Sequence, residues 1–151
     1  MRGVVRGGLS RRLWFGLLPL LLMGGCSPAN PLVPVTGSVT VKGEPAEGAI
    51  VLFYPENDPG GITSSGAAGK DGRFQVMSAV SQGIAPGRYQ VTVTWPDPAV
   101  QPTPQQMMMG TAEDGPDLLK GRYASRQASP LKVEITAGQK ELAPFELEIP
   151  Q

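Results

Sequence analysis

The sequence predicts an all-β fold, a β-sandwich of seven strands over residues 35–149. Short runs of alternating apolar and polar residues recur at spacings of roughly ten residues, as is typical of sandwiches. Glycine and proline, 20 and 16 of the 151 residues, separate these runs as turn residues. No run keeps the helical period of about 3.6 residues, and this argues against a helical bundle.

In the first half of the domain, the sequence predicts four strands, over residues 35–41, 49–54, 62–68 and 73–77. The run 49–54 is apolar at every position, which is typical of a strand covered on both faces. The run 62–68 is the weakest of the four. Gly69-Lys70-Asp71-Gly72 predicts the hairpin turn before the fourth strand, because Asp-Gly suits the tight turns between paired strands.

The second half predicts three strands, over residues 89–95, 131–135 and 145–149. In the first of them Tyr89, Val91, Val93 and Trp95 alternate with Gln90, Thr92 and Thr94. We therefore expect an apolar face on the core and a polar face in solvent. Five prolines interrupt the pattern over 96–116, which predicts a long loop insertion. One helical turn is expected over 117–123.

The first 25 residues have the pattern of an export signal. Four arginines lie within the first 12 residues, and an apolar run of 11 residues follows over 13–23. A membrane-spanning helix needs about 20 apolar residues, so this run is short for one. The segment Leu22-Met23-Gly24-Gly25-Cys26 resembles a bacterial lipobox. That resemblance implies cleavage before Cys26 and acylation of its thiol, with palmitate as the expected chain.

Two alternatives stay open for this leader. An uncleaved amino-terminal anchor with an incidental cysteine would also fit the apolar run. The segment Ser10-Arg11-Arg12-Leu13-Trp14-Phe15 resembles a twin-arginine export motif, with Trp14 where that motif usually has phenylalanine. The export route is therefore left open between the general and the twin-arginine pathways.

Cleavage before Cys26 would leave 126 of the 151 residues, which is one domain by length. Residues 26–34 are expected to form a proline-rich tether. Cys26 is the only cysteine, so a disulfide framework is excluded. After the leader, nine basic residues stand against 13 acidic ones, a net charge of −4. This balance argues against nucleic acid and anionic headgroups as partners.

Three patterns carry a family resemblance: Gly37-x-Val39-x-x-x-Gly43-x-Pro45-x-x-Gly48-Ala49-x-Val51-x-Phe53, Gly69-Lys70-Asp71-Gly72-Arg73-Phe74, and Pro86-Gly87-Arg88-Tyr89-x-Val91-x-Val93. In this order they resemble the carboxypeptidase regulatory-like, or transthyretin-like, Ig-like β-sandwich. The resemblance covers about residues 35–95 and extends loosely to 149. Small bacterial lipoproteins with one such domain after a lipobox are similar over the whole length. The resemblance implies a scaffold and names no catalytic residue.

The sequence contains no histidine. Serine–histidine and cysteine–histidine catalysis are therefore excluded, and the commonest transition-metal ligand is missing. With Cys26 acylated, a thiolate zinc site is excluded as well. We expect a protein that is not an enzyme, with no catalytic residues and no cofactor.

Two groups of residues leave a metal-binding alternative open. Glu113, Asp114 and Asp117, and separately Glu56 with Asp58, could offer oxygen ligands to calcium. Neither group has the regular spacing of a known calcium loop, so solvated acidic loops are the simpler interpretation. Met107, Met108 and Met109 could offer thioethers to copper(I). Methionines in a loop more often pack against the domain or a partner.

The expected function is that of a non-enzymatic, membrane-anchored envelope lipoprotein that binds or supports another envelope protein. Ser27 follows the cysteine where aspartate is the familiar inner-membrane retention signal. The lipoprotein resemblance thus implies the outer membrane rather than the inner one. A carbohydrate- or cell-wall-binding module that uses Trp95 is one alternative. A copper- or calcium-binding envelope protein is another. The binding residues and the partner are not identified by the sequence.

Overall fold

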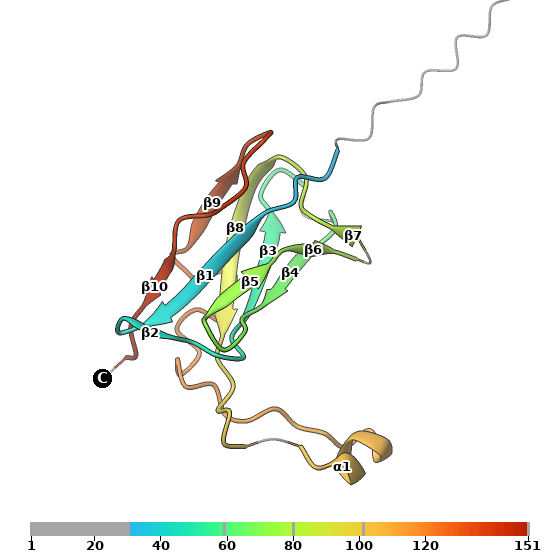
Figure 1. Ribbon diagram of the computed structural model, residues 1–151, viewed down its shortest axis with the longest axis vertical. Helices are drawn as coiled ribbons and strands as arrows, with labels where there is room; N and C mark the ends of the chain where they lie inside the picture. Colours follow the sequence, from blue (N-terminus) through green and yellow to red (C-terminus); the bar gives the residue numbers. More distant parts are fainter. Residues whose placement is uncertain (1–30, 59, 80, 101, 151) are drawn as a thin grey trace, which may run out of the picture.

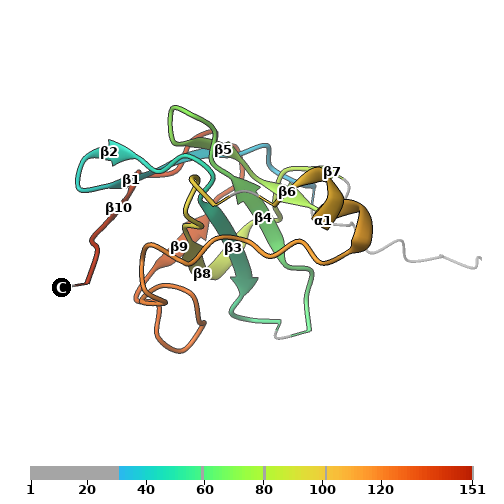
Figure 2. The same ribbon diagram turned by 90° about the horizontal axis from the view of Figure 1, so that it is seen from below.

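The computed structural model describes residues 31–150 except 59, 80 and 101. In this part of the chain the protein is predominantly β, with ten strands in two sheets and one short helix. Figures 1 and 2 show the strands gathered in one body, and Figure 1 shows the helix, α1 (Pro104–Met109), at the end of a long projection.

The larger sheet contains six strands, all antiparallel to their neighbours. Their order is β7 (Ser81–Gln82), β6 (Met77–Ser78), β4 (Ser64–Ala67), β3 (Ile50–Pro55), β8 (Gly87–Thr94) and β9 (Lys132–Ile135). The central pair sets the inward face: Val51 lies opposite Val93, and Phe53 lies opposite Val91. All four side chains are fully buried, because same-face residues alternate along each strand.

The smaller sheet is built around β1 (Thr36–Val41). Its other strands are β10 (Phe145–Leu147), which runs parallel to β1, and β2 (Glu44–Pro45) and β5 (Arg73–Gln75), which run antiparallel to it. Residues 73–78 connect the two sheets, since β5 pairs with β1 and β6 pairs with β4. A strand that changes sheets in this way closes one corner of a sandwich.

An aromatic cluster holds the two sheets together. Phe53, Phe74, Tyr89 and Phe145 come from four strands, and their ring centroids lie 6.2–6.5 Å apart in the pairs Phe53–Phe74, Phe53–Tyr89, Phe53–Phe145 and Phe74–Phe145. Burying such a side chain stabilises a fold by about 1.5–3 kcal/mol. Gly37 and Gly66 make room for Phe74, because a Cβ atom at either position would collide with its ring.

Tyr89 also fixes the start of β8. Its hydroxyl donates a hydrogen bond of 2.8 Å to the carbonyl of Ala85, four residues earlier. This is the geometry of a tyrosine corner, a feature of Ig-like sandwiches. Burial raises the pKa of the Tyr89 hydroxyl above its ordinary value.

Each of the seven predicted ranges overlaps a strand of the structure. The structure divides the predicted strand 73–77 into β5 and β6 and adds β2 and β7. β2, β6 and β7 have two residues each, too few to produce a visible alternation. Over 117–123 the structure has hydrogen-bonded turns instead of the expected helical turn. Positive φ angles at Lys120 and Gly121 break the helical path there.

The expectation that Thr92 faces solvent is wrong, since Thr92 is 2% exposed. Residues 124–130 fold over this outer face of β3 and β8. The Arg126 guanidinium lies 4.7 Å from the centroid of the Tyr54 ring, and the Ser129 hydroxyl donates to the Val91 carbonyl at 2.6 Å. The polar face of β8 is therefore covered by a segment distant in sequence.

The folded part begins earlier than residue 35. Val33 is buried, its N–H donates to the Ile84 carbonyl at 2.8 Å, and its own carbonyl accepts from the Ile84 N–H at 3.0 Å. The predicted leader 1–25, Cys26 and tether residues 27–30 lie outside the described residues. No helix among the described residues is long and apolar enough to cross a membrane.

Candidate functional site: the arm opposite the tether

Residues 96–116 form an arm that leaves the sandwich at the end of β8 and returns to it (Figure 1). Hydrogen bonds close its base: the Asp97 N–H donates to the Pro116 carbonyl at 3.1 Å, and the Leu118 N–H donates to the Trp95 carbonyl at 2.9 Å. The sequence predicts a long loop insertion over these same residues. The two ends of the arm are thus held together by the backbone, and the segment between them projects.

Asp117 fixes this base. Its Oδ1 atom accepts hydrogen bonds from the N–H groups of Trp95 and Leu119 at 2.9 and 3.0 Å, and its Oδ2 atom accepts from the Gly121 N–H at 2.9 Å. A carboxylate that accepts three backbone donors has little capacity left for a cation. The geometry therefore favours a structural role for Asp117 over the role of calcium ligand considered from the sequence.

Trp95 is also built into the arm base. Its ring packs against the hydrophobic core, and its indole N–H donates to the Glu47 carbonyl at 2.9 Å. A sugar platform needs a free aromatic face, and Trp95 is only partly exposed. The arrangement agrees with the expectation that Trp95 belongs to the apolar face that packs on the core.

The tip of the arm is the helix α1 (Pro104–Met109), which the sequence analysis did not expect. Thr103 caps it, since its side chain accepts from the Gln106 N–H while the Gln106 side chain accepts from the Thr103 N–H. Pro104 occupies the first helical position, and Gly110 ends the helix with a φ of 67°. The capping box Thr-x-x-Gln followed by a positive-φ glycine was the signal that could have located this helix.

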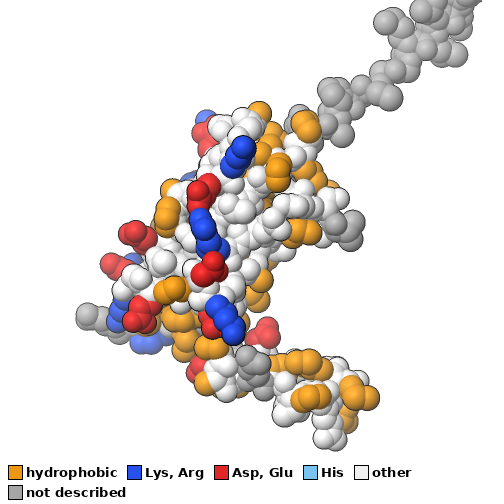
Figure 3. Space-filling model, viewed as in Figure 1, with side chains coloured by type: hydrophobic (Ala, Val, Ile, Leu, Met, Phe, Trp, Pro, Cys, Tyr) orange, Lys and Arg blue, Asp and Glu red, His pale blue; other side chains and the backbone are white. Residues whose placement is uncertain are grey.

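The three methionines of α1 project into solvent. Met107, Met108 and Met109 are 60%, 90% and 69% exposed, and no residue of α1 is buried. Consecutive helical residues point roughly 100° apart, so these three thioethers diverge and do not converge on one ion. The geometry thus disfavours copper(I) coordination and leaves an apolar tip. Residues 98–112 contain no charged side chain, and Figure 3 shows the tip free of charge.

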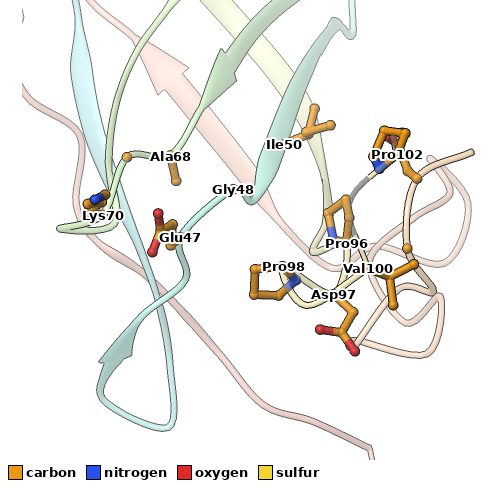
Figure 4. Close-up of a pocket in the computed structure, with 13 residues that line it drawn as sticks. Glu47, Gly48, Ile50, Ala68, Lys70, Pro96, Asp97, Pro98, Val100 and Pro102 are labelled. Carbon is orange, nitrogen blue, oxygen red and sulfur yellow. The ribbon is translucent and has the colours of Figure 1, made fainter. Parts of the chain in front are cut away.

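A groove of about 390 Å³ lies where the arm meets the sandwich (Figure 4). One wall consists of Glu47 in the turn before β3, Ile50 at the start of β3, and Lys70 in the turn after β4. Pro96, Val100 and Pro102 of the arm line the other wall. The groove is open to solvent and depends on the arm for half of its lining. It is therefore part of the arm site and not a separate enclosed cavity.

The remaining acidic candidates are dispersed. Glu56 forms an ion pair of 2.7 Å with Lys132, and Asp58 lies in the loop after β3. Glu113 and Asp114 are exposed on the returning half of the arm. Within the described ranges, no group of three or more acidic, cysteine or histidine side chains is placed to hold a metal ion.

The chain enters the sandwich at the end opposite the arm. Figure 1 shows the first described residues at one end of the long axis and α1 at the other. The bridge between Val33 and Ile84 fixes the point of entry. The described part of the chain therefore begins at the end distant from the methionines.

No family model matches this chain, and no curated protein or solved structure matches it either.

Proposed function

We propose that this chain is a bacterial envelope lipoprotein, acylated at Cys26 after loss of residues 1–25 and held on the outer membrane. Its domain is a non-enzymatic, transthyretin-like sandwich whose seven principal strands support the arm. The arm binds another protein of the envelope. One observation carries this proposal: the one helix of the described chain buries no residue and ends the arm with three exposed, uncharged methionines, opposite the point where the described chain begins.

The tether geometry supports an outward-facing arm. Val33 lies seven positions after Cys26, and an extended chain advances by at most about 3.5 Å per residue. A lipid on Cys26 would keep the entry end within roughly 25 Å of the bilayer. The arm, at the opposite end of the domain, could then reach proteins of the envelope.

The chemistry of the tip supports a protein partner. Methionine is flexible and polarizable, so a methionine surface adapts to apolar grooves of irregular shape. A short helix that offers apolar side chains to a groove is a common form of recognition between proteins. The capping box and Gly110 hold α1 formed before binding, which lowers the ordering cost of that encounter.

Two features support the finer fold assignment. The tyrosine corner at Tyr89 is typical of Ig-like sandwiches. Gly37, which the family pattern includes, is required by the contact with Phe74. Both features belong to the scaffold, and they agree with a domain that displays a binding element without doing chemistry.

Lipidation is tested by intact mass. The mature protein should lack residues 1–25 and carry acyl chains on Cys26, and Cys26→Ser should leave the precursor uncleaved or release the protein from membranes. A membrane-bound precursor of unmodified mass would instead support the uncleaved anchor. A mature protein without acyl chains would contradict the lipoprotein assignment.

Partner binding is tested by a photo-crosslinking amino acid at Met108 in living cells. A matched probe at Glu134, which is exposed on β9 away from the arm, serves as the control. We expect a discrete crosslinked species from position 108 that position 134 does not give. Replacing Met107 and Met109 by glutamine should weaken it, because the apolar contact is lost while the helix is kept. Equal crosslinking from both positions would contradict the proposal.

A further inference from the structure

The exposed large apolar side chains of the described chain gather at two places. Val100, Met107, Met108 and Met109 belong to the arm. The other two, Leu32 and Ile62, are 38% and 69% exposed and line one groove at the tether end, with a volume of about 440 Å³. Ile62 lies in the loop between β3 and β4, so a loop distant in sequence meets the start of the chain there. Figure 3 shows hydrophobic side chains at the end of the domain where the described residues begin.

We infer that this tether end is a membrane-docking surface, and that Leu32 and Ile62 rest on the bilayer that holds the anchor. The inference depends on the proposed acylation of Cys26. Leu32 lies only six positions after Cys26, a span of at most roughly 21 Å. An anchored domain on so short a tether meets the bilayer with this end far more often than with any other face.

The chemistry of the surface fits a lipid interface. Asp58 and Arg88 lie on the same groove and carry one charge of each sign, which suits zwitterionic headgroups. The net charge of −4 after the leader gives no general attraction to anionic lipid, so apolar contact must supply the preference. The buried hydroxyls of the groove are already paired: Ser64 and Ser78 lie 2.6 Å apart, and Ser78 donates to the Gly83 carbonyl. The buried polar groups of the groove therefore need no ligand, and the exposed Leu32 and Ile62 at its rim are the groups available to contact a bilayer.

The consequence is a fixed orientation. With Leu32 and Ile62 on the bilayer, the long axis stands upright and the methionine tip is held away from the anchoring membrane. A domain that swung freely on its tether would present the arm in all directions. Docking at the tether end thus directs the arm site towards partners above the membrane.

The test uses the full-length chain, processed and acylated in cells, in vesicles of phosphatidylethanolamine and phosphatidylcholine. Cys26 is the only cysteine, so with its thiol acylated an introduced cysteine is the single site for a fluorescent label. Ile62→Cys places the label on the proposed surface, and Met108→Cys places it on the arm tip. A lipid-borne nitroxide should quench the label at 62 at least threefold more strongly than the label at 108. Equal quenching in anchored protein would overturn the docking surface.

A second pair of variants separates apolar docking from mere closeness. Thr63 is exposed and follows Ile62 in the sequence. A label on Thr63→Cys therefore measures how close the tether end lies to the bilayer while Ile62 is still present. Adding Ile62→Ser should at least halve its quenching, and unchanged quenching would overturn the role of Ile62. Failure of the anchor is distinguishable, because the protein would then leave the vesicles and show an unmodified Cys26 mass.

Discussion

The sandwich and the arm use the same chain in opposite ways. The structure places 21 buried hydrophobic residues in the core, and none of them belongs to residues 96–116. In the arm, α1 is held by Thr103, Gln106 and Gly110, that is, by caps and not by packing. Helix caps contribute about 1 kcal/mol each, whereas a buried aromatic side chain contributes about 1.5–3 kcal/mol. Most of the stability of the fold therefore comes from the sandwich. The sequence of the arm can be selected for binding, because it contributes little to folding.

The boundary between the two regions is narrow. Trp95 and Asp117 belong to the sandwich, Trp95 by its packing and Asp117 by its hydrogen bonds. Asp97, two residues after Trp95, already belongs to the arm. Changes on either side of this boundary should differ sharply in their effect on stability. The following predictions run from the largest expected effect to the smallest.

Val91→Asp should unfold the domain or destabilise it by more than about 4 kcal/mol, because it buries a charge with no partner beside Phe53. Thr92→Asp should also destabilise, by about 2 kcal/mol, because the Thr92 side chain is covered by residues 124–130. Arg88→Asp on the exposed end of β8 is the control. Chemical denaturation monitored by circular dichroism measures all three, and a silent Thr92→Asp would show that the covering segment is loose.

Asp117→Ala should cost about 2 kcal/mol, because three backbone N–H groups lose their acceptor at the arm base. The matched control is Asp114→Ala, an exposed carboxylate on the arm, which should change the unfolding free energy by less than about 0.5 kcal/mol. Limited proteolysis should cut the Asp117→Ala protein faster within 96–116. Equal stability of the two variants would mean that the base is held by other contacts.

Tyr89→Phe should cost about 1 kcal/mol through loss of the bond to the Ala85 carbonyl. Tyr89 also predicts a pH dependence. Since burial raises the pKa of Tyr89 in the fold, the unfolded chain loses this proton first as the pH rises. Stability should therefore be unchanged by this group below about pH 10 and should fall above it. The fall should be smaller in Tyr89→Phe, as measured by urea denaturation at several pH values.

The sequence predicted the strands well where alternation was long, as in the run from Tyr89 to Trp95. The prediction from sequence failed where a segment distant in the chain determines burial. The residues near Thr92 give no indication that residues 124–130 fold over this face of β8. The prediction missed α1 because the surrounding prolines outweighed the capping signal of Thr103 and Gln106. The position of the arm was predicted, but its place opposite the tether was not. That relation depends on how β3 and β8 span the sandwich, which only the sheet pairing reveals.

The smallest effect on stability is expected from the variant that removes the most residues. Replacing residues 98–114 by a short Gly/Ser linker removes α1 and the methionines but leaves Asp117, Trp95 and the base hydrogen bonds in place. No core side chain is lost, and shortening a loop changes its closure entropy by only about 0.6 kcal/mol for each halving of length. The melting temperature should move by no more than about 3 °C, while co-purification of the envelope partner identified by crosslinking from position 108 should disappear. A gentler variant keeps the arm and changes only its three methionines to glutamine, and it should reproduce the loss of partner co-purification with no change in melting temperature. If the linker variant melts far below the parent protein, the arm contributes to the core after all, and the division between a stable sandwich and a free binding arm is wrong.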